Sequence, residues 1–121
     1  MPQNKQEIFK LLLDLHKALL ENQKAEYEKT YGIINDANKY FQLVVGHEEF
    51  SWLRQLSAKI AVFDEILESD DQDITDVSQE IILLLSDEND DKFYRKLKKT
   101  MADNDIAKMT ENIIKALKNP A

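Results

Sequence analysis

Two strips of polar side chains interrupt helix faces that are otherwise apolar, and both contain residue types that perform acid–base chemistry. The candidate residues are His16, Gln23, Glu26 and Tyr27 in the first strip and Arg54, Ser57 and Asp64 in the second. Within each strip, the spacing places the side chains on one side of an α-helix. If the two helices pack antiparallel, a histidine beside a carboxylate can accept a proton, or the strips can together bind a small polar ligand.

The same residues also have a purely structural interpretation. Burying an isolated charge is costly, so a carboxylate on an apolar face must be paired, hydrogen-bonded or hydrated. We therefore expect Arg54 and Asp64 to form a structural ion pair at a helix interface or at the edge of the bundle. His16 needs a partner for at least one ring nitrogen, and a histidine satisfied in the core or at its boundary is the simpler expectation.

Two long helices are needed to hold these strips. The first is predicted to start after Asn4 as N-cap, with Glu7 placed as in a capping box, and to continue until Gly32 ends it. The second is predicted to cover residues 47–67 without a break and to be the central helix of the fold. It contains the only tryptophan of the chain, Trp52.

Four further helices are expected to complete the fold. Their predicted ranges are 36–45, 76–85, 92–102 and 104–118, with Asn35, Thr75 and Asn104 as N-caps. In the range 36–45, the predicted inward stripe consists of Tyr40, Phe41 and Val44. Residues 68–73 and 86–91 are acidic connectors, and neither has the glycine and glutamate positions that a calcium loop requires.

The composition restricts the fold to the all-α class. The chain of 121 residues has two Gly and two Pro, and Pro2 and Pro120 lie at its ends, so the interior has almost no helix breakers. A hydrophobic content of 43% supports a folded protein. We expect residues 1–121 to form a single-domain helical bundle of five or six helices, with the first and third helices longest.

Composition and motifs argue against several function classes. The chain has no Cys, which removes disulfides and Cys-rich zinc sites. Neither His belongs to a metal-binding Glu-x-x-His motif, and there is no phosphate-binding glycine loop, so no metal or cofactor is predicted. A net charge of -7 disfavours nucleic acid. No apolar run is long enough for a signal segment or a membrane span, which leads us to expect a cytoplasmic protein.

Two segments are candidates for contact with a partner. Residues 81–85 are apolar almost all round, which indicates either burial on two sides or a partner surface. Residues 92–99 carry five basic and no acidic side chains, as helices that bind phosphate or a membrane surface do. The alternative for this basic helix is an outer face that lies opposite the acidic connectors of the same chain.

The two polar strips lie within motifs that resemble a protein family. The first motif is Leu15-His16-Lys17-Ala18-Leu19-Leu20, followed by Tyr27-Glu28 and Gly32. The second is Phe50-x-Trp52-Leu53-Arg54-x-Leu56-Ser57-x-x-Ile60-x-x-x-Asp64-Glu65. Together they resemble a family of small, uncharacterised bacterial all-helical proteins, a domain of unknown function. The resemblance covers about the first half of the chain and implies a bacterial, cytoplasmic helical domain. The family pattern has Glu where this chain has Gln23, so one carboxylate for a metal site there is missing.

These observations favour a non-enzymatic module that binds a protein partner or self-associates, with residues 81–85 or the Trp52 side as interface. The alternative is a small-ligand sensor or enzyme that uses His16, Arg54 and Asp64. The direction of the polar strips separates the two interpretations. Convergence on one cavity favours a site, whereas outward-facing or directly paired side chains favour architecture.

Overall fold

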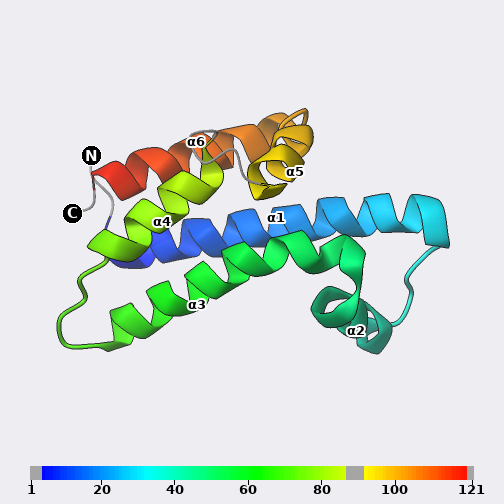
Figure 1. The fold of residues 1–121 in the computed structure, drawn as a ribbon, viewed down its shortest axis with the longest axis horizontal. Coiled ribbons are helices and arrows are strands. Elements are labelled where there is room, and N and C mark those ends of the chain that lie inside the picture. Colours follow the sequence, from blue (N-terminus) through cyan, green and yellow to red (C-terminus); the bar gives the residue numbers. More distant parts are fainter. Residues whose placement is uncertain (1–3, 87–91, 120–121) are drawn as a thin grey trace.

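A computed structural model describes residues 4–86 and 92–119, and all regular elements in these ranges are helical (Figure 1). In chain order the elements are α1 (Lys5–Tyr31), α2 (Ala37–Gly46), the 3₁₀ helix η1 (Glu48–Leu53), α3 (Arg54–Glu68), α4 (Thr75–Leu85), α5 (Lys92–Thr100) and α6 (Asn104–Lys118). The predicted all-α bundle is therefore confirmed.

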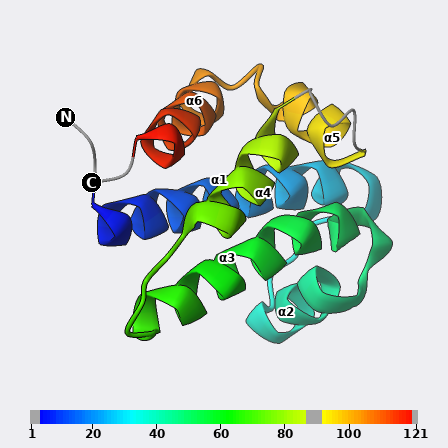
Figure 2. The same ribbon diagram turned by 60° about the vertical axis from the view of Figure 1, so that its left-hand side comes forward.

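Four of these helices surround the main core. α1 packs against α3 and α6, and α4 closes the set by packing against both α3 and α6. In chain order, the four helices run in alternating directions (Figures 1 and 2). α2 and η1 are inserted between the first two members of the set, and α5 is inserted between the last two. This is the up-down-up-down arrangement of a helical bundle, with two short helical insertions.

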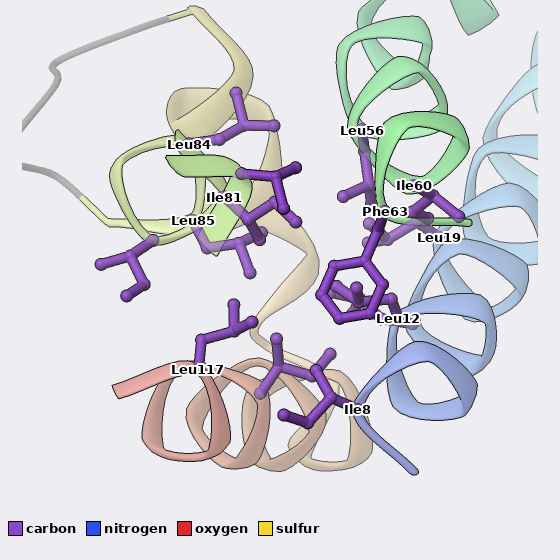
Figure 3. Packing of buried hydrophobic residues seen from close by; sticks show 14 of the residues in the cluster. Ile8, Leu12, Leu19, Leu56, Ile60, Phe63, Ile81, Leu84, Leu85 and Leu117 are labelled. Atoms are coloured by element: carbon purple, nitrogen blue, oxygen red, sulfur yellow. The ribbon is translucent and has the colours of Figure 1, made fainter. Parts of the chain in front are cut away.

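One face of each bundle helix supplies the core. Along α1 the buried apolar residues Ile8, Leu12, Leu15 and Leu19 recur every three or four positions, as the helical period requires. Figure 3 shows core side chains of α1, α3, α4 and α6 pointing toward a common centre. The labelled ones are Ile8, Leu12, Leu19, Leu56, Ile60, Phe63, Ile81, Leu84, Leu85 and Leu117.

A second, smaller cluster holds α2. Its buried members are Tyr27, Ile34 and Phe50, and the half-buried residues Tyr40, Leu43 and Val44 of α2 pack against them. The predicted inward stripe of this helix is wrong at Phe41, whose side chain is exposed. No residue of α2 is buried. α2 is therefore attached to the bundle by one narrow, partly covered stripe.

The predicted central helix is not continuous. Residues 48–53 form η1, and the α-helical part, α3, has 15 residues, the same length as α6. A side-chain cap starts the 3₁₀ segment, because Nδ1 of His47 accepts a hydrogen bond from the Glu49 backbone N–H at 3.0 Å. The Ser51 hydroxyl then donates to the Glu48 carbonyl at 2.7 Å. Of the two helices predicted to be longest, only α1, with 27 residues, exceeds the others.

The ends of α1 are as predicted. The Asn4 side chain accepts a hydrogen bond from the Glu7 backbone N–H at 2.8 Å. Gly32 follows α1 with φ of 96°, and its N–H donates to the Glu28 carbonyl. A residue with a Cβ is strained at such a φ, which is why a glycine occupies this position.

Three other N-caps differ from the prediction by one residue. Asp36 and Asp103 are the N-caps of α2 and α6, and their carboxylates accept from the backbone N–H groups of Asn38 and Asp105. At α4 the N-cap position is Ile74, which has no capping side chain, and the Asp73 carboxylate before it accepts from the Thr75 backbone N–H. In each case an aspartate stands within two residues of the predicted cap, and its carboxylate accepts the backbone N–H two positions further along the chain. The first connector covers residues 69–74, one position later than predicted, because Glu68 still belongs to α3. Residues 87–91 of the second acidic connector lie outside the described residues.

The apolar run at residues 81–85 belongs to the core. Ile81, Ile82, Leu84 and Leu85 are buried, and only Leu83 is exposed. Trp52 is also buried, and its ring centroid lies 5.2 Å from that of Phe93. For residues 81–85 the burial agrees with the first of the two interpretations, burial on two sides. The Trp52 side as an interface stays a prediction. Among the described helices, none combines the length and apolar character needed to cross a membrane.

Candidate functional site

α1 and the η1–α3 segment lie antiparallel, and among the described contacts the pair His16–Ser57 joins the two polar strips. Phe9 lies against Phe63 with ring centroids 6.1 Å apart. Further along α1, His16 contacts Ser57, and Gln23 contacts Trp52. As the residue number rises on α1 it falls on the opposite segment, which is the register of antiparallel helices. The polar contacts His16–Ser57 and Gln23–Trp52 thus lie within a helix–helix interface whose other contacts are apolar.

His16 and Ser57 form a direct pair. The His16 Nε2 atom and the Ser57 Oγ atom are 2.6 Å apart, the imidazole is half-buried and Ser57 is exposed. Burial disfavours the charged imidazolium and lowers the pKa of His16 below its ordinary value of 6.5. A neutral imidazole that bonds a serine hydroxyl is the first half of a nucleophile–base arrangement.

The groups that complete such an arrangement are not found beside this pair. Catalysis by a serine–histidine pair needs an acceptor that orients Nδ1 and hydrogen-bond donors for the developing oxyanion. The described hydrogen bonds give Nδ1 of His16 no carboxylate partner, and neither of the two grooves described below is lined by His16 or Ser57. The pair therefore acts as a polar link between α1 and α3.

Arg54 and Asp64 do not form the predicted ion pair. They lie ten residues apart on one helix, a rise of about 15 Å, which is beyond the reach of an arginine side chain to a neighbouring carboxylate. Arg54 instead donates through Nη2 to the backbone carbonyl of Val45 at 2.8 Å, near the C-terminal end of α2. Asp64 is exposed. The three candidates His16, Arg54 and Asp64 thus occupy separate places along α3 and its surroundings.

Gln23 is the most buried polar member of the first strip. Its side chain is 7% exposed, and its Oε1 atom accepts a hydrogen bond from the indole Nε1–H of Trp52 at 2.8 Å. This bond fixes the orientation of the amide, so Nε2 is directed to Glu49, whose Oε2 atom lies 3.5 Å away. The indole N–H would otherwise be buried without a partner.

The two remaining members of the first strip have structural partners. Tyr27 is buried in an aromatic cluster, with its ring centroid 4.6 Å from Tyr31 and 5.2 Å from His47. Glu26 is exposed and pairs with Lys29 at 2.9 Å. Such an exposed pair contributes little to stability because solvent screens it.

A groove opens beside the Gln23–Trp52 bond, between α1 and η1 on one side and α5 on the other. It has a volume of about 510 Å³. Its polar lining residues are Asn22, Gln23, Glu26, Glu49, Lys96, Lys99, Thr100 and Asp103, and Trp52 and Ala102 complete it. Sequence reasoning singled out Gln23 and Glu26 but missed Glu49 and the way α5 faces them. The signal present in the sequence was the pair Lys96 and Lys99, which are three residues apart and so share one face of α5.

A second groove, between α4, α5 and α6, is mainly apolar. Its volume is about 460 Å³, and its lining includes Tyr94, Met101 and Ile114 with Lys115 and Glu111 at its margin. Lys115 and Glu111 form an exposed ion pair at 3.0 Å. Within residues 4–86 and 92–119, no group of three or more His, Asp and Glu side chains is arranged to hold a metal ion.

Apolar side chains are exposed at the end of the molecule formed by α2 and the α1–α2 connection, at the right in Figure 1. We call Tyr31, Ile33, Phe41 and Val45 the α2 surface. Phe41 is 67% exposed and Val45 is 55% exposed, and their four-residue spacing places them on one side of α2. The sequence did not single out this surface, because the helical period alone does not distinguish the inner from the outer flank of a short apolar helix.

Comparison of the chain with protein-family models, with curated proteins and with solved structures found no match. The bacterial family that residues 15–65 resemble therefore stays a prediction.

Proposed function

We propose that this chain is a small, non-enzymatic bacterial protein of the cytoplasm that works by self-association through the α2 surface. The observation that supports the proposal is the exposure of α2. Five of its ten residues are large and apolar, Tyr40, Phe41, Leu43, Val44 and Val45, yet none is buried. Large apolar residues that lie together are generally buried in soluble proteins, and an exposed apolar surface of this kind is typical of an interaction site.

The charge distribution of α2 favours a second copy of the chain as the occupant. Between Ala37 and Gly46 the only charged residue is Lys39, although 32% of the whole chain is charged. A helix with so little charge can be buried against a neighbour at low desolvation cost. Two copies of α2 can thus meet without bringing several like charges together, despite the net charge of -7 on each chain.

The two ends of α2 carry groups of opposite charge, which would meet if the α2 helices of two copies paired antiparallel about a two-fold axis. Asp36 caps the N-terminal end, and the Arg54 guanidinium lies on the Val45 carbonyl near the C-terminal end. In an antiparallel pair of identical helices, the N-terminal end of each lies beside the C-terminal end of the other. Each Asp36 carboxylate then approaches the Arg54 of the second copy, while Phe41 lies near the middle of the contact.

The size of the α2 surface determines how tightly two copies are expected to associate. Full burial of one Phe or Val side chain contributes about 1.5–3 kcal/mol, and two-fold symmetry provides every contact twice. Association itself costs about 4–15 kcal/mol in lost translational and rotational freedom. Because the apolar patch is small, we expect a weak, transient dimer with a dissociation constant on the order of micromolar or weaker.

Sedimentation equilibrium on the full chain, from micromolar to millimolar concentration, tests the proposal. The average mass is expected to rise toward that of a dimer as concentration rises. Phe41→Gln and Val45→Gln are expected to hold the chain at the monomer mass, because each replaces apolar contact with a hydrated amide. Circular dichroism of each variant confirms that it is folded.

Val62→Gln is the matched control. Val62 is a helical valine of similar exposure, 42%, but it lies on α3 outside the α2 surface. It is expected to dimerise like the parent chain. A parent chain that remains monomeric at millimolar concentration, or a Phe41→Gln variant that dimerises as the parent does, overturns the proposal.

A further inference from the structure

We propose that the groove between α1, η1 and α5 binds a small zwitterion, a molecule that carries an ammonium and a carboxylate group, such as a free amino acid. This site is independent of self-association, since no residue of α2 lines the groove. The inference depends on three features: two walls of opposite charge, a buried amide with spare hydrogen-bonding capacity, and an apolar ring beside it.

The two walls carry opposite charge and do not neutralise each other. Glu26 and Glu49 line the side formed by α1 and η1, whereas Lys96 and Lys99 line the side formed by α5. Asp103, which follows α5, also lines the groove, and its carboxylate caps α6 by accepting from the Asp105 backbone N–H. Among the described residues, Glu26 pairs with Lys29 on its own helix, and no ion pair joins Glu26 or Glu49 to Lys96 or Lys99 across the groove. Within the described part of the chain, Glu49 on one wall and the two lysines on the other thus have no ion-pair partner and can meet a group of opposite charge on a bound molecule.

Gln23 supplies a fixed donor between the walls. Its Oε1 atom is occupied by Trp52, and its Nε2 atom has one long contact, 3.5 Å, to Glu49. An amide nitrogen carries two hydrogens, so the second one has no acceptor among the described residues. Because Gln23 is 93% covered and lines the groove, this hydrogen is a preorganised donor for a ligand carboxylate.

The mixture of charges selects the ligand class. A simple anion is repelled by Glu26 and Glu49, and a simple cation by Lys96 and Lys99. A zwitterion satisfies both walls, with its carboxylate toward the lysines and the Gln23 amide and its ammonium toward Glu49. Trp52 and Ala102 are the apolar residues of the lining, and an aliphatic side chain of the ligand can pack against them.

The single tryptophan makes the test direct, because Trp52 lines the groove and is the only source of indole fluorescence. L-Leucine, L-lysine and L-glutamate are titrated into the full chain at millimolar concentration, and the Trp52 emission is recorded, with calorimetry as a second readout. L-Leucine is compared with 4-methylpentanoate, which lacks the ammonium group, and with 3-methylbutylamine, which lacks the carboxylate. We expect the amino acid to bind at least about tenfold more tightly than either analogue, since each loses one charged contact.

Variants on the two walls identify the binding groups. Lys96→Gln, Lys99→Gln and Glu49→Gln are each expected to weaken binding of the amino acid by about tenfold. Lys98→Gln is the matched control, because Lys98 is exposed on α5 and does not line the groove. It is expected to bind as the parent does. The proposal is wrong if none of the three amino acids changes the emission or the heat, or if L-leucine and 4-methylpentanoate bind alike.

Discussion

The side-chain oxygen of Gln23 lies 2.8 Å from the indole nitrogen of Trp52, and this buried hydrogen bond joins the C-terminal third of α1 to η1. The two residues are 29 positions apart in the chain. The bond gives the buried indole N–H an acceptor and orients the Gln23 amide nitrogen toward Glu49. It therefore links the packing of the bundle to the shape of the adjoining groove.

Replacing either partner of this bond is expected to destabilise the fold. Gln23→Leu leaves the Trp52 N–H buried and unpaired, at a cost of about 1–3 kcal/mol in the free energy of unfolding. Trp52→Phe leaves the Gln23 oxygen unpaired and also removes ring volume beside Phe93. The double variant should cost less than the sum of the two single costs, because it removes both halves of the bond. Urea unfolding followed by circular dichroism measures all three, and strictly additive costs would contradict the assignment.

The pH dependence of stability is expected to contain a contribution from His16. Burial lowers the pKa of this imidazole in the folded chain, so the unfolded chain binds the proton more readily. The stability that comes from keeping His16 neutral in the fold is therefore fully present above pH 6.5, the ordinary pKa of the side chain. It declines as the pH falls from there toward the lowered pKa of the folded chain.

Comparison with His16→Gln isolates this effect. The variant keeps a polar side chain opposite Ser57 but does not titrate, so its stability should fall less than that of the parent between about pH 7.5 and about pH 5. Urea unfolding at a series of pH values supplies the measurement. Equal slopes for parent and variant would show that the pKa of His16 is the same in the folded and unfolded chains.

The hydrogen bonds that Asp73 accepts at the start of α4 predict a change in stability in the acid range. The Thr75 hydroxyl and the Thr75 backbone N–H donate hydrogen bonds to Asp73 and hold the pKa of its carboxyl below the ordinary value of 3.8. Stability from this carboxylate is present above that value and is lost as the pH falls through the lowered pKa.

Asp73→Ala is therefore expected to be less stable than the parent at neutral pH, with a difference that shrinks as the solution is acidified. Asp73→Asn is expected to lie between them, because its amide oxygen can still accept the Thr75 N–H but carries no charge. Thermal unfolding monitored by circular dichroism at neutral and acid pH checks both. A difference that grows on acidification would contradict the carboxylate role.

The two-fold arrangement proposed for α2 predicts a specific charge effect. Asp36→Asn keeps an N-cap of equal quality while removing the carboxylate, so the dimer should weaken although the stability of the monomer is nearly unchanged. Its dimerisation should also depend less on salt concentration than that of the parent.

Asp103→Asn is the matched control for this charge effect, because it makes the same change at the cap of α6, away from the α2 surface. Sedimentation equilibrium at two salt concentrations compares the variants. If Asp36→Asn and the parent have the same dissociation constant, the Asp36 carboxylate does not contact the second copy.

The sequence by itself determined the local structure of this protein. Hydrophobic periodicity located α1 and its buried face. The Asn4 cap followed from the hydrogen-bonding side chain of asparagine, and the positive φ at Gly32 followed from the missing Cβ of glycine. These features depend on interactions within one or two helical turns, so neighbouring residues suffice to specify them. The N-caps that differ from the prediction, at Asp36, Ile74 and Asp103, each differ from it by one residue.

Only the tertiary structure decided which polar residues meet. The angular position of Arg54 and Asp64 suggested a pair, but the axial rise between them separates the two side chains, and Arg54 is held by Val45 instead. Trp52 found its partner on α1, and Lys96 and Lys99 were placed opposite Glu49 by the packing of α5 against η1. Helical periodicity fixes the direction of a side chain about its own axis, whereas the position of one axis relative to another depends on packing between residues far apart in the chain.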